Sequence, residues 1–268
     1  MMRRVKAHHL LLAALCLGAA HGAVAAEGVP RPKLRPTAPA SATPVAAAPV
    51  PRPRPTPKDE SQPPAEETNG GWSAAEVAAT RAVCATLLSG LDISYRPVDP
   101  IGGQGGCGAP APIEVSAVAG VTLVPPATQT CAMAAALAAW VTDDVQPAAR
   151  KRLGTDVTEI RTATSYACRR RNNGSAGKMS EHSKANALDM SGFTFAKNPD
   201  VAVGGSGNWG EGLLGAIGLS KGGSFLEDIR SAACAHFTTV LGPGSDPYHG
   251  DHFHVDVLQR KGGYRICQ

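Results

Sequence analysis

"NALDMSGFTF", residues 186–195, alternates apolar residues with polar or small ones, and this stretch decides the fold. Side chains two positions apart in a β-strand point to the same face, so the pattern predicts a strand with Leu188 and Met190 facing the core. Asp189 then projects from the opposite face, which we expect to be accessible to solvent. The loop before the strand can fold back and place His182 beside Asp189.

A second strand of the same kind is predicted at "HFHVDVLQ", residues 252–259. His252, His254 and Asp256 share one face of this strand, while the apolar residues between them share the other. Two imidazoles side by side repel each other when both are charged. We therefore expect a bound group to orient them.

Two long helices are predicted before most of the strand patterns. Residues 73–90 begin with Ser73, carry Glu76 three positions later in a capping-box pattern, and end at Gly90. Residues 131–154 form a long, mostly apolar stretch with a proline near its end. Helices gathered before a group of short strands predict an α+β domain, with an antiparallel sheet and flanking helices.

The N-terminal quarter of the chain is not expected to fold. Residues 1–26 are typical of a signal peptide, and the alternative is an uncleaved anchor, although the apolar stretch is too short to span a bilayer. Residues 27–71 are predicted to be a Pro/Ala-rich disordered spacer, because 12 of the 22 prolines lie between Pro30 and Pro64. A folded domain is expected over residues 72–268, in a periplasmic or secreted protein that has no transmembrane helix after signal removal.

The cysteine count and the charge balance narrow the class of protein. Six cysteines follow the predicted signal peptide, and an even number in an exported protein predicts three disulfides, whose pairing the sequence does not choose. These are Cys84, Cys107, Cys131, Cys168, Cys234 and Cys267. None lies in a CxxC pair, which disfavours zinc ribbons and thioredoxin-like redox chemistry.

Residues 72–268 carry 17 basic and 17 acidic side chains, so nucleic-acid binding has no electrostatic support.

His182, Asp189 and His254 are a candidate set of zinc ligands. Two histidines and one carboxylate from separate strands leave the fourth tetrahedral position of Zn²⁺ open for water, whose pKa the metal lowers to about 7. A structural zinc site more often has four ligands that include thiolates, and here the cysteines are expected in disulfides. The alternative is that these are unrelated surface histidines, which explains either stretch alone better than it explains both together.

Two motifs carry a resemblance to a known superfamily. The first resembles the S-x-H-x-x-G-x-A-x-D motif of zinc D-Ala-D-Ala carboxypeptidases and dipeptidases, a superfamily shared with the hedgehog signalling domain. It reads Ser180-x-His182-x-x-Ala185-x-Ala187-x-Asp189. The second motif of that superfamily resembles the run Asp251-His252-Phe253-His254.

A closer resemblance covers nearly all of the predicted domain. The run from about Trp72 to Gln268 resembles the bacterial extensin-like C-terminal domain proteins, including the stretches "TSYACRRRN", "SEHSKANALDMSGF", "DHFHVDV" and "YRIC". The two resemblances together imply a disulfide-stapled fold like that of the D-Ala-D-Ala carboxypeptidases and hedgehog.

The resemblance also implies roles for individual residues. The three candidate ligands would hold Zn²⁺, and Asp251 would be the general base that takes a proton from water. His252 would lie behind the ligands or hydrogen-bond the oxyanion. Arg169 would polarise the scissile carbonyl or hold a substrate carboxylate, a task that suits the fixed fork of donors on arginine.

The chain departs from the superfamily pattern at three places. Ala185 replaces the usual glycine, which leaves the loop slightly stiffer. Asp251 is shorter than the glutamate of many relatives and must lie closer to the water. Two residues separate the tyrosine from Arg169, so Arg170 or Arg171 could take its role, or none of them if the run is a solvated basic surface.

Three other candidates are weaker. His249 is an alternative ligand, but it lies between Pro247 and Gly250 in what is expected to be a loop. His236 is expected to have a structural role on an apparent helix. The glycine-rich residues 203–215 lack the context of a phosphate-binding loop and are expected to form a surface loop that rims the cleft.

These residues and the resemblance imply an exported zinc-dependent peptidase-like domain that hydrolyses peptidoglycan or its stem peptides. Its type would be a D,D- or L,D-carboxypeptidase or an endopeptidase. The alternative from another class is a non-catalytic, zinc-bearing cell-wall binding module, which has no need of a base at Asp251. A third reading is a disulfide-rich structural domain without a metal.

Overall fold

The structure is a computed structural model. It describes residues 68–69, 71–102, 105–204 and 220–268. The predicted signal peptide lies outside these residues, as do the predicted spacer up to residue 67 and most of the glycine-rich stretch 203–215. Within the described ranges, no helix combines the length and the apolar character that crossing a membrane requires.

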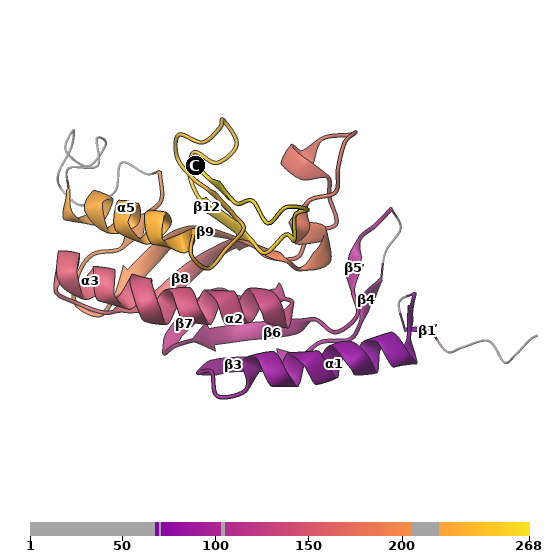
Figure 1. The fold of residues 1–268 in the computed structure, drawn as a ribbon. Coiled ribbons are helices and arrows are strands. Elements are labelled where there is room, and N and C mark those ends of the chain that lie inside the picture. Colours follow the sequence, from indigo (N-terminus) through magenta and orange to yellow (C-terminus); the bar gives the residue numbers. More distant parts are fainter. Residues whose placement is uncertain (1–67, 70, 103–104, 205–219) are drawn as a thin grey trace, which may run out of the picture. The chain divides into compact units, whose positions relative to one another are not determined.

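The described part of the chain is a mixed α+β domain (Figure 1). The helical elements are α1 (Ala74–Leu88), α2 (Cys131–Trp140), the π-helical turn η1 (Val141–Val145), α3 (Gln146–Leu153), the 3-10 turns η2 (Arg171–Asn173) and η3 (Glu181–Lys184), and α5 (Lys221–Ala233). The strands are β1 (Thr68–Asn69), β2 (Trp72–Ser73), β3 (Ile93–Pro97), β4 (Ile101–Gly102), β5 (Gly108–Ala109), β6 (Ile113–Val118), β7 (Val121–Gln129), β8 (Val157–Thr164), β9 (Ala187–Phe195), β10 (Val201–Ala202), β11 (Thr239–Leu241), β12 (Phe253–Asp256) and β13 (Ile266–Cys267).

One large sheet organises the domain. Its strands follow the order β13-β11-β12-β9-β8-β7-β6-β3, and β10 pairs with β9 as a ninth strand. The predicted antiparallel arrangement holds for most neighbours, but β7 and β8 are parallel, as are β11 and β13. The first exception follows from the chain path, because the helical run from α2 to α3 connects β7 to β8 and returns the chain in the same direction.

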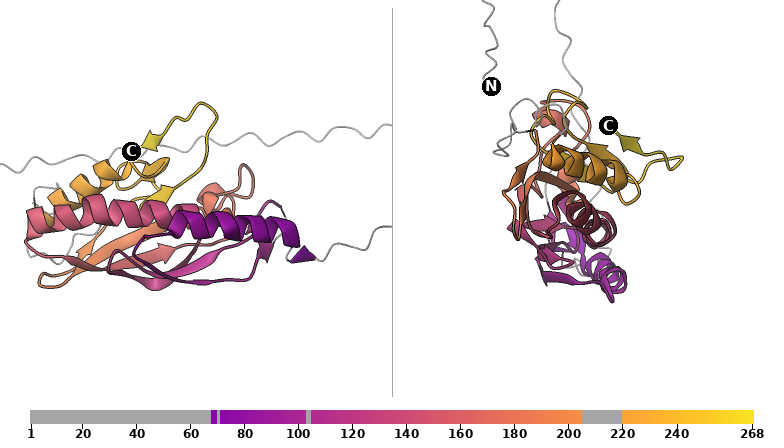
Figure 2. Two further views of the ribbon diagram at one scale, coloured as in Figure 1. Left: turned by 60° about the horizontal axis from the view of Figure 1, so that its bottom comes forward. Right: turned by 90° about the vertical axis from the view of Figure 1, so that its left-hand side faces the viewer.

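The helices lie along one face of this sheet, as both views of Figure 2 show. Leu188 and Met190 are fully buried among the core residues on that side, as the alternation in residues 186–195 predicts. Trp140 lies at the centre of this core, with its indole N–H donating to the Ile229 carbonyl at 3.0 Å. Its ring meets Phe193 and Phe237 edge-on. The opposite face of β9 is therefore free to carry polar side chains.

The two predicted helices form, and one of them is interrupted. The capping box of Ser73 and Glu76 is present in full at the start of α1. The predicted long helix is helical from Cys131 to Leu153, but it contains the π-helical turn η1 directly before α3. Pro147 lies in the first turn of α3 and has no N–H to donate, so the regular hydrogen-bond ladder cannot continue through this point.

Three disulfides link segments that are far apart in the sequence. Cys84 on α1 joins Cys131 at the start of α2, Cys107 joins Cys168, and Cys234 joins Cys267. The second bridge holds the segment directly before Arg169, and the third holds β13 to the end of α5. All six cysteines after the predicted signal peptide are thus paired.

Candidate metal centre

The tight turn η3 places His182. Ser180 caps this turn, and its hydroxyl accepts a hydrogen bond from the His182 N–H, while Ser183 donates its hydroxyl to the Ser180 carbonyl at 2.7 Å. The turn ends at Ala185, which is fully buried and left-handed with φ of 57°. This conformation costs an alanine about 1–2 kcal/mol relative to glycine.

The pairing of β9 with β12 places the other two candidate ligands. Asp189 and His254 are directly opposite each other in the antiparallel register. Both alternate with core residues, so both side chains project from the face opposite the helices. Two stretches that are 65 residues apart in the sequence thereby meet at one point.

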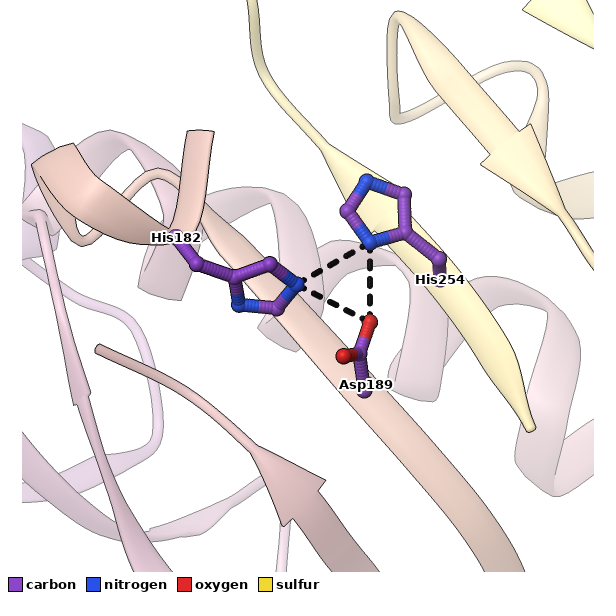
Figure 3. Close-up of side chains that lie close together, drawn as sticks. All are labelled: His182, Asp189 and His254. Atoms are coloured by element: carbon purple, nitrogen blue, oxygen red, sulfur yellow. Dashed lines mark hydrogen bonds and ion pairs between the residues drawn. The ribbon is translucent and has the colours of Figure 1, made fainter. Parts of the chain in front are cut away.

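The three side chains converge on a common centre (Figure 3). The Nε2 atom of His182 lies 3.0 Å from Oδ1 of Asp189 and 3.1 Å from Nδ1 of His254. The Nδ1 atom of His254 lies 2.8 Å from the same carboxylate oxygen. The structure therefore brings together all three residues that the sequence predicts as zinc ligands.

The outer nitrogen of each histidine faces an acceptor. Nδ1 of His182 lies 2.6 Å from the carbonyl oxygen of Ser165, and Nε2 of His254 lies 3.5 Å from Oδ2 of Asp256. A carbonyl or carboxylate oxygen can only accept, so the outer nitrogens donate in these contacts, and an inner nitrogen that is also protonated donates to Asp189. In a neutral imidazole the inner nitrogen then presents its lone pair to the centre.

The electrostatics of the cluster favour positive charge at its centre. Burial alone would raise the pKa of Asp189, but hydrogen bonds from His182 and His254 hold that pKa well below its usual range. Burial alone would lower the pKa of His254, but hydrogen bonds to Asp189 and Asp256 outweigh it and raise the pKa to about 9. A buried site that draws in a proton this strongly also suits a metal cation.

One expectation about this site is wrong. Asp189 was expected on an accessible face, yet it is only 4% exposed. β9 lies between β8 and β12, and the side chains of His182, Arg169 and His252 surround the carboxylate. The alternation correctly predicts which face carries Asp189, but it contains no information about the segments that cover that face.

A cavity of about 630 Å³ opens over the cluster. Its lining includes the three clustered residues together with Arg169, Arg171, Tyr248, His249 and His252. Cavities of this size commonly hold small ligands. Residues far from the cluster in sequence, including the segment after β8 and the loop before β12, thus border one space.

One known family matches the part of the chain that contains this whole site. Residues 82–268 match the family model described as "Extensin-like protein C-terminus". The chain belongs to this family. No curated protein and no solved structure shows significant similarity to the chain.

The extensin-like domain places Arg169 in the cavity wall. Its Nη2 atom lies 3.7 Å from Oδ2 of Asp189, and its carbonyl accepts a hydrogen bond from the Ser180 N–H. Arg170 instead donates to the Gly177 carbonyl and does not line the cavity. Arg171 lines the cavity but is more exposed. Of the three arginines, Arg169 is the one that contacts the candidate ligands.

His252 and Asp251 form a pair at the edge of the cluster. Nδ1 of His252 lies 2.8 Å from Oδ1 of Asp251, and Nε2 lies 3.8 Å from Oδ1 of Asp189. His252 lines the cavity, whereas the Asp251 side chain is 88% exposed and does not. The hydrogen bond from His252 lowers the pKa of Asp251, which keeps its carboxylate ionised. The structure thus places His252, not Asp251, between the cluster and the cavity.

His249, considered above only as an alternative ligand, is not part of the clustered set but lies in the same cavity wall. This residue is buried, lines the cavity, and its ring lies 5.1 Å from that of His252 between centroids. Its Nδ1 lies 2.7 Å from Oδ1 of Asp246, so a second carboxylate–histidine pair adjoins the first. The sequence signal was the cluster of acids and histidines in "DPYHGDHFH", where Asp246 precedes His249 by three residues and Asp251 precedes His252 by one. By contrast, His236 lies after α5 and pairs with Asp144 at 2.7 Å, outside the cavity.

Proposed function

We propose that this extensin-like domain is an exported zinc-dependent peptidase that hydrolyses peptidoglycan stem-peptide bonds. The observation that carries the proposal is the convergence of His182 Nε2, Asp189 Oδ1 and His254 Nδ1, each within 3.1 Å of the other two. The substrate class rests on the resemblance of the two motifs to the D-Ala-D-Ala carboxypeptidase and hedgehog superfamily. The predicted signal peptide and the three disulfides are consistent with export.

The donor set fits zinc. Two imidazole nitrogens and one carboxylate oxygen are ligand types that Zn²⁺ prefers, and three protein ligands are typical of catalytic rather than structural sites. The outer nitrogens are held by Ser165 and Asp256, which is the usual arrangement of histidine ligands. A zinc ion bound here would supply a Lewis acid that polarises a carbonyl and lowers the pKa of water.

His252 is proposed as the proton-transfer group, in place of Asp251. Asp251 accepts the Nδ1–H of His252, so Nε2 of the neutral ring carries a lone pair toward the cavity. His252 Nε2 can accept a proton from water and return it to the amine nitrogen that leaves when the peptide bond breaks. Asp251 holds the ring in the tautomer that this transfer requires.

Arg169 is proposed to bind the substrate. Its guanidinium lines the cavity 3.7 Å from the Asp189 carboxylate, so it can reach a substrate carbonyl or carboxylate beside the cluster. A guanidinium keeps its charge at every physiological pH and offers paired donors to such an oxygen. This orientation role needs no proton transfer.

The proposal is tested with purified peptidoglycan fragments and mass spectrometry of the products. Wild-type protein supplied with zinc is expected to release a defined stem-peptide product. His252→Ala is expected to keep its zinc and to lose about 10²- to 10⁴-fold in rate, which is typical for removal of a general base. His236→Ala is the matched control, because that histidine also pairs with a carboxylate but lies outside the cavity.

Two outcomes contradict the proposal in different ways. If His252→Ala retains most of the activity while Asp251→Asn has none, the base is Asp251 and the roles of the two residues are exchanged. If zinc-loaded wild-type protein cleaves none of the fragments but binds them, the domain is the non-catalytic cell-wall binding module.

A further inference from the structure

Asp256 lies behind His254, on the side away from the cluster. The residue is 4% exposed and has no role in the sequence motifs. Oδ2 lies 3.5 Å from Nε2 of His254, while Oδ1 accepts hydrogen bonds from Thr239 Oγ1 at 2.7 Å, Thr238 Oγ1 at 3.1 Å and the Leu258 N–H at 3.1 Å. One oxygen therefore anchors the carboxylate and leaves the other for the histidine.

We propose that Asp256 is a positioning residue that fixes the tautomer and the ring orientation of His254 for metal binding. This inference rests on the proposed zinc site. By accepting the Nε2–H, Asp256 leaves the lone pair on Nδ1, the atom that faces His182 and Asp189. A carboxylate on the outer nitrogen also makes the inner nitrogen a stronger ligand.

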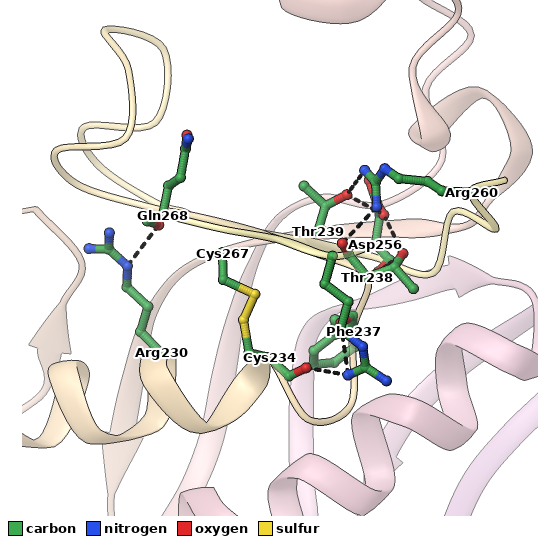
Figure 4. Close-up of a disulfide and its surroundings, with 10 residues drawn as sticks. Arg230, Cys234, Phe237, Thr238, Thr239, Asp256, Arg260, Cys267 and Gln268 are labelled. Atoms are coloured by element: carbon green, nitrogen blue, oxygen red, sulfur yellow. Dashed lines mark hydrogen bonds between the residues drawn. A yellow bond between two sulfur atoms is a disulfide. The ribbon is translucent and has the colours of Figure 1, made fainter. Parts of the chain in front are cut away.

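A chain of directed hydrogen bonds holds Asp256 in place (Figure 4). Arg260 donates to the hydroxyl oxygen of Thr239, so the single Thr239 hydroxyl proton is directed to Asp256. Arg260 also donates to the Thr238 carbonyl. Arg260 thus fixes the Thr239 hydroxyl, which fixes the Asp256 carboxylate, which in turn orients His254.

The C-terminal strand secures this chain at the edge of the sheet. β13 pairs with β11 in parallel, with Ile266 opposite Thr239. The disulfide between Cys234 and Cys267 ties β13 to the end of α5 (Figure 4). The segment carrying Thr239 is therefore fixed on both sides, by β12 and by β13.

The test compares zinc affinity in three folded, metal-free proteins, measured by competition with a chromophoric chelator. Asp256→Asn keeps the shape of the side chain but removes its charge and one acceptor, and should weaken zinc binding about 10- to 100-fold. Asp144→Asn is the matched control. It removes the carboxylate that partners His236, outside the cavity, and should bind zinc like the wild type.

The melting temperature of each metal-free protein separates positioning from general stability. A merely structural Asp256 would lower the melting temperature of Asp256→Asn but leave the zinc affinity of the folded protein unchanged, which overturns the inference. Failure of the wild type to bind zinc instead overturns the proposed function. Should Asp256→Asn not fold, Thr239→Val decides, because it keeps Asp256 but breaks the chain from Arg260. Thr239→Val is expected to bind zinc several-fold more weakly, and unchanged affinity contradicts the inference.

Discussion

Gly204 supports the loop that carries Asp251 and His252, and its replacement by alanine tests this contact. The residue follows β10 and has φ of 68°. A Cβ atom added to it would lie 1.7 Å from the carbonyl oxygen of Gly250 and 2.8 Å from Cα of Asp251. Real Cβ atoms essentially never approach other atoms within 3.0 Å, so the backbone at residue 204 or at Gly250 and Asp251 must shift.

Two effects of Gly204→Ala have to be separated. The left-handed backbone alone costs an alanine about 1–2 kcal/mol of stability. The displaced loop should in addition move His252 away from the cluster, and a shift of about 1 Å at a catalytic group can cost about 10²-fold in rate. Zinc content should not change, since the three proposed ligands come from η3, β9 and β12, outside the displaced loop.

Gly154 is the matched control for this experiment. It has the same φ of 68°, but a Cβ added there meets nothing within 4 Å. Gly154→Ala should therefore show the backbone cost in its melting temperature and keep wild-type turnover of a peptidoglycan fragment. Equal turnover in Gly204→Ala and Gly154→Ala would refute the claim that the Gly204 contact positions His252.

Four further predictions concern the cluster, Arg169 and the disulfides. The pKa of His254 is raised to about 9 in the metal-free protein, so below that pH zinc must displace a proton from the ring. The affinity of the domain for zinc should therefore fall about tenfold for each pH unit that the pH is lowered. Chelator competition at several pH values measures this dependence. In the same metal-free protein, the stability that protonated His254 contributes is complete below pH 6.5 and should be lost as the pH rises through about 9, which denaturant titrations can follow. Arg169→Lys should reduce turnover without abolishing it, because lysine keeps the charge and loses the fork of donors. Arg170→Lys should leave turnover unchanged. Equal turnover in the two variants would contradict the proposal that Arg169 binds the substrate. Thiol titration of the unfolded, unreduced exported protein should find no free cysteine, and loss of each bridge should cost about 2–5 kcal/mol; two or more free thiols per chain contradict the pairing.

Local features of the fold could be predicted because they depend on residues close together in the sequence. The capping box at Ser73 and Glu76 satisfies backbone groups within one turn of helix, so its pattern is visible without a structure. The alternation of Leu188, Asp189 and Met190 likewise assigns faces from spacing alone. The α+β class follows from such local patterns taken together.

The remaining features depend on contacts between distant segments. The parallel pairing of β7 with β8 follows from the path of the helices between them, and each disulfide joins segments that are 33 to 61 residues apart in the sequence. The burial of Asp189 depends on which strands and loops cover β9. Asp256 was given no role because the Thr239 hydroxyl that anchors it is 17 residues away in the sequence, and His249 was given little because the cavity that it lines is formed by distant segments.

If His182, Asp189 and His254 form a zinc centre, the purified domain should hold one zinc ion per chain. Equilibrium dialysis of the wild type and of His254→Ala, followed by metal analysis, measures this quantity, with His236→Ala as the control outside the cavity. We expect one zinc per chain in the wild type and in His236→Ala, and a severe loss in His254→Ala, because two remaining ligands hold zinc poorly. Unchanged zinc content in His254→Ala, or no zinc in the wild type, would contradict the proposed zinc centre.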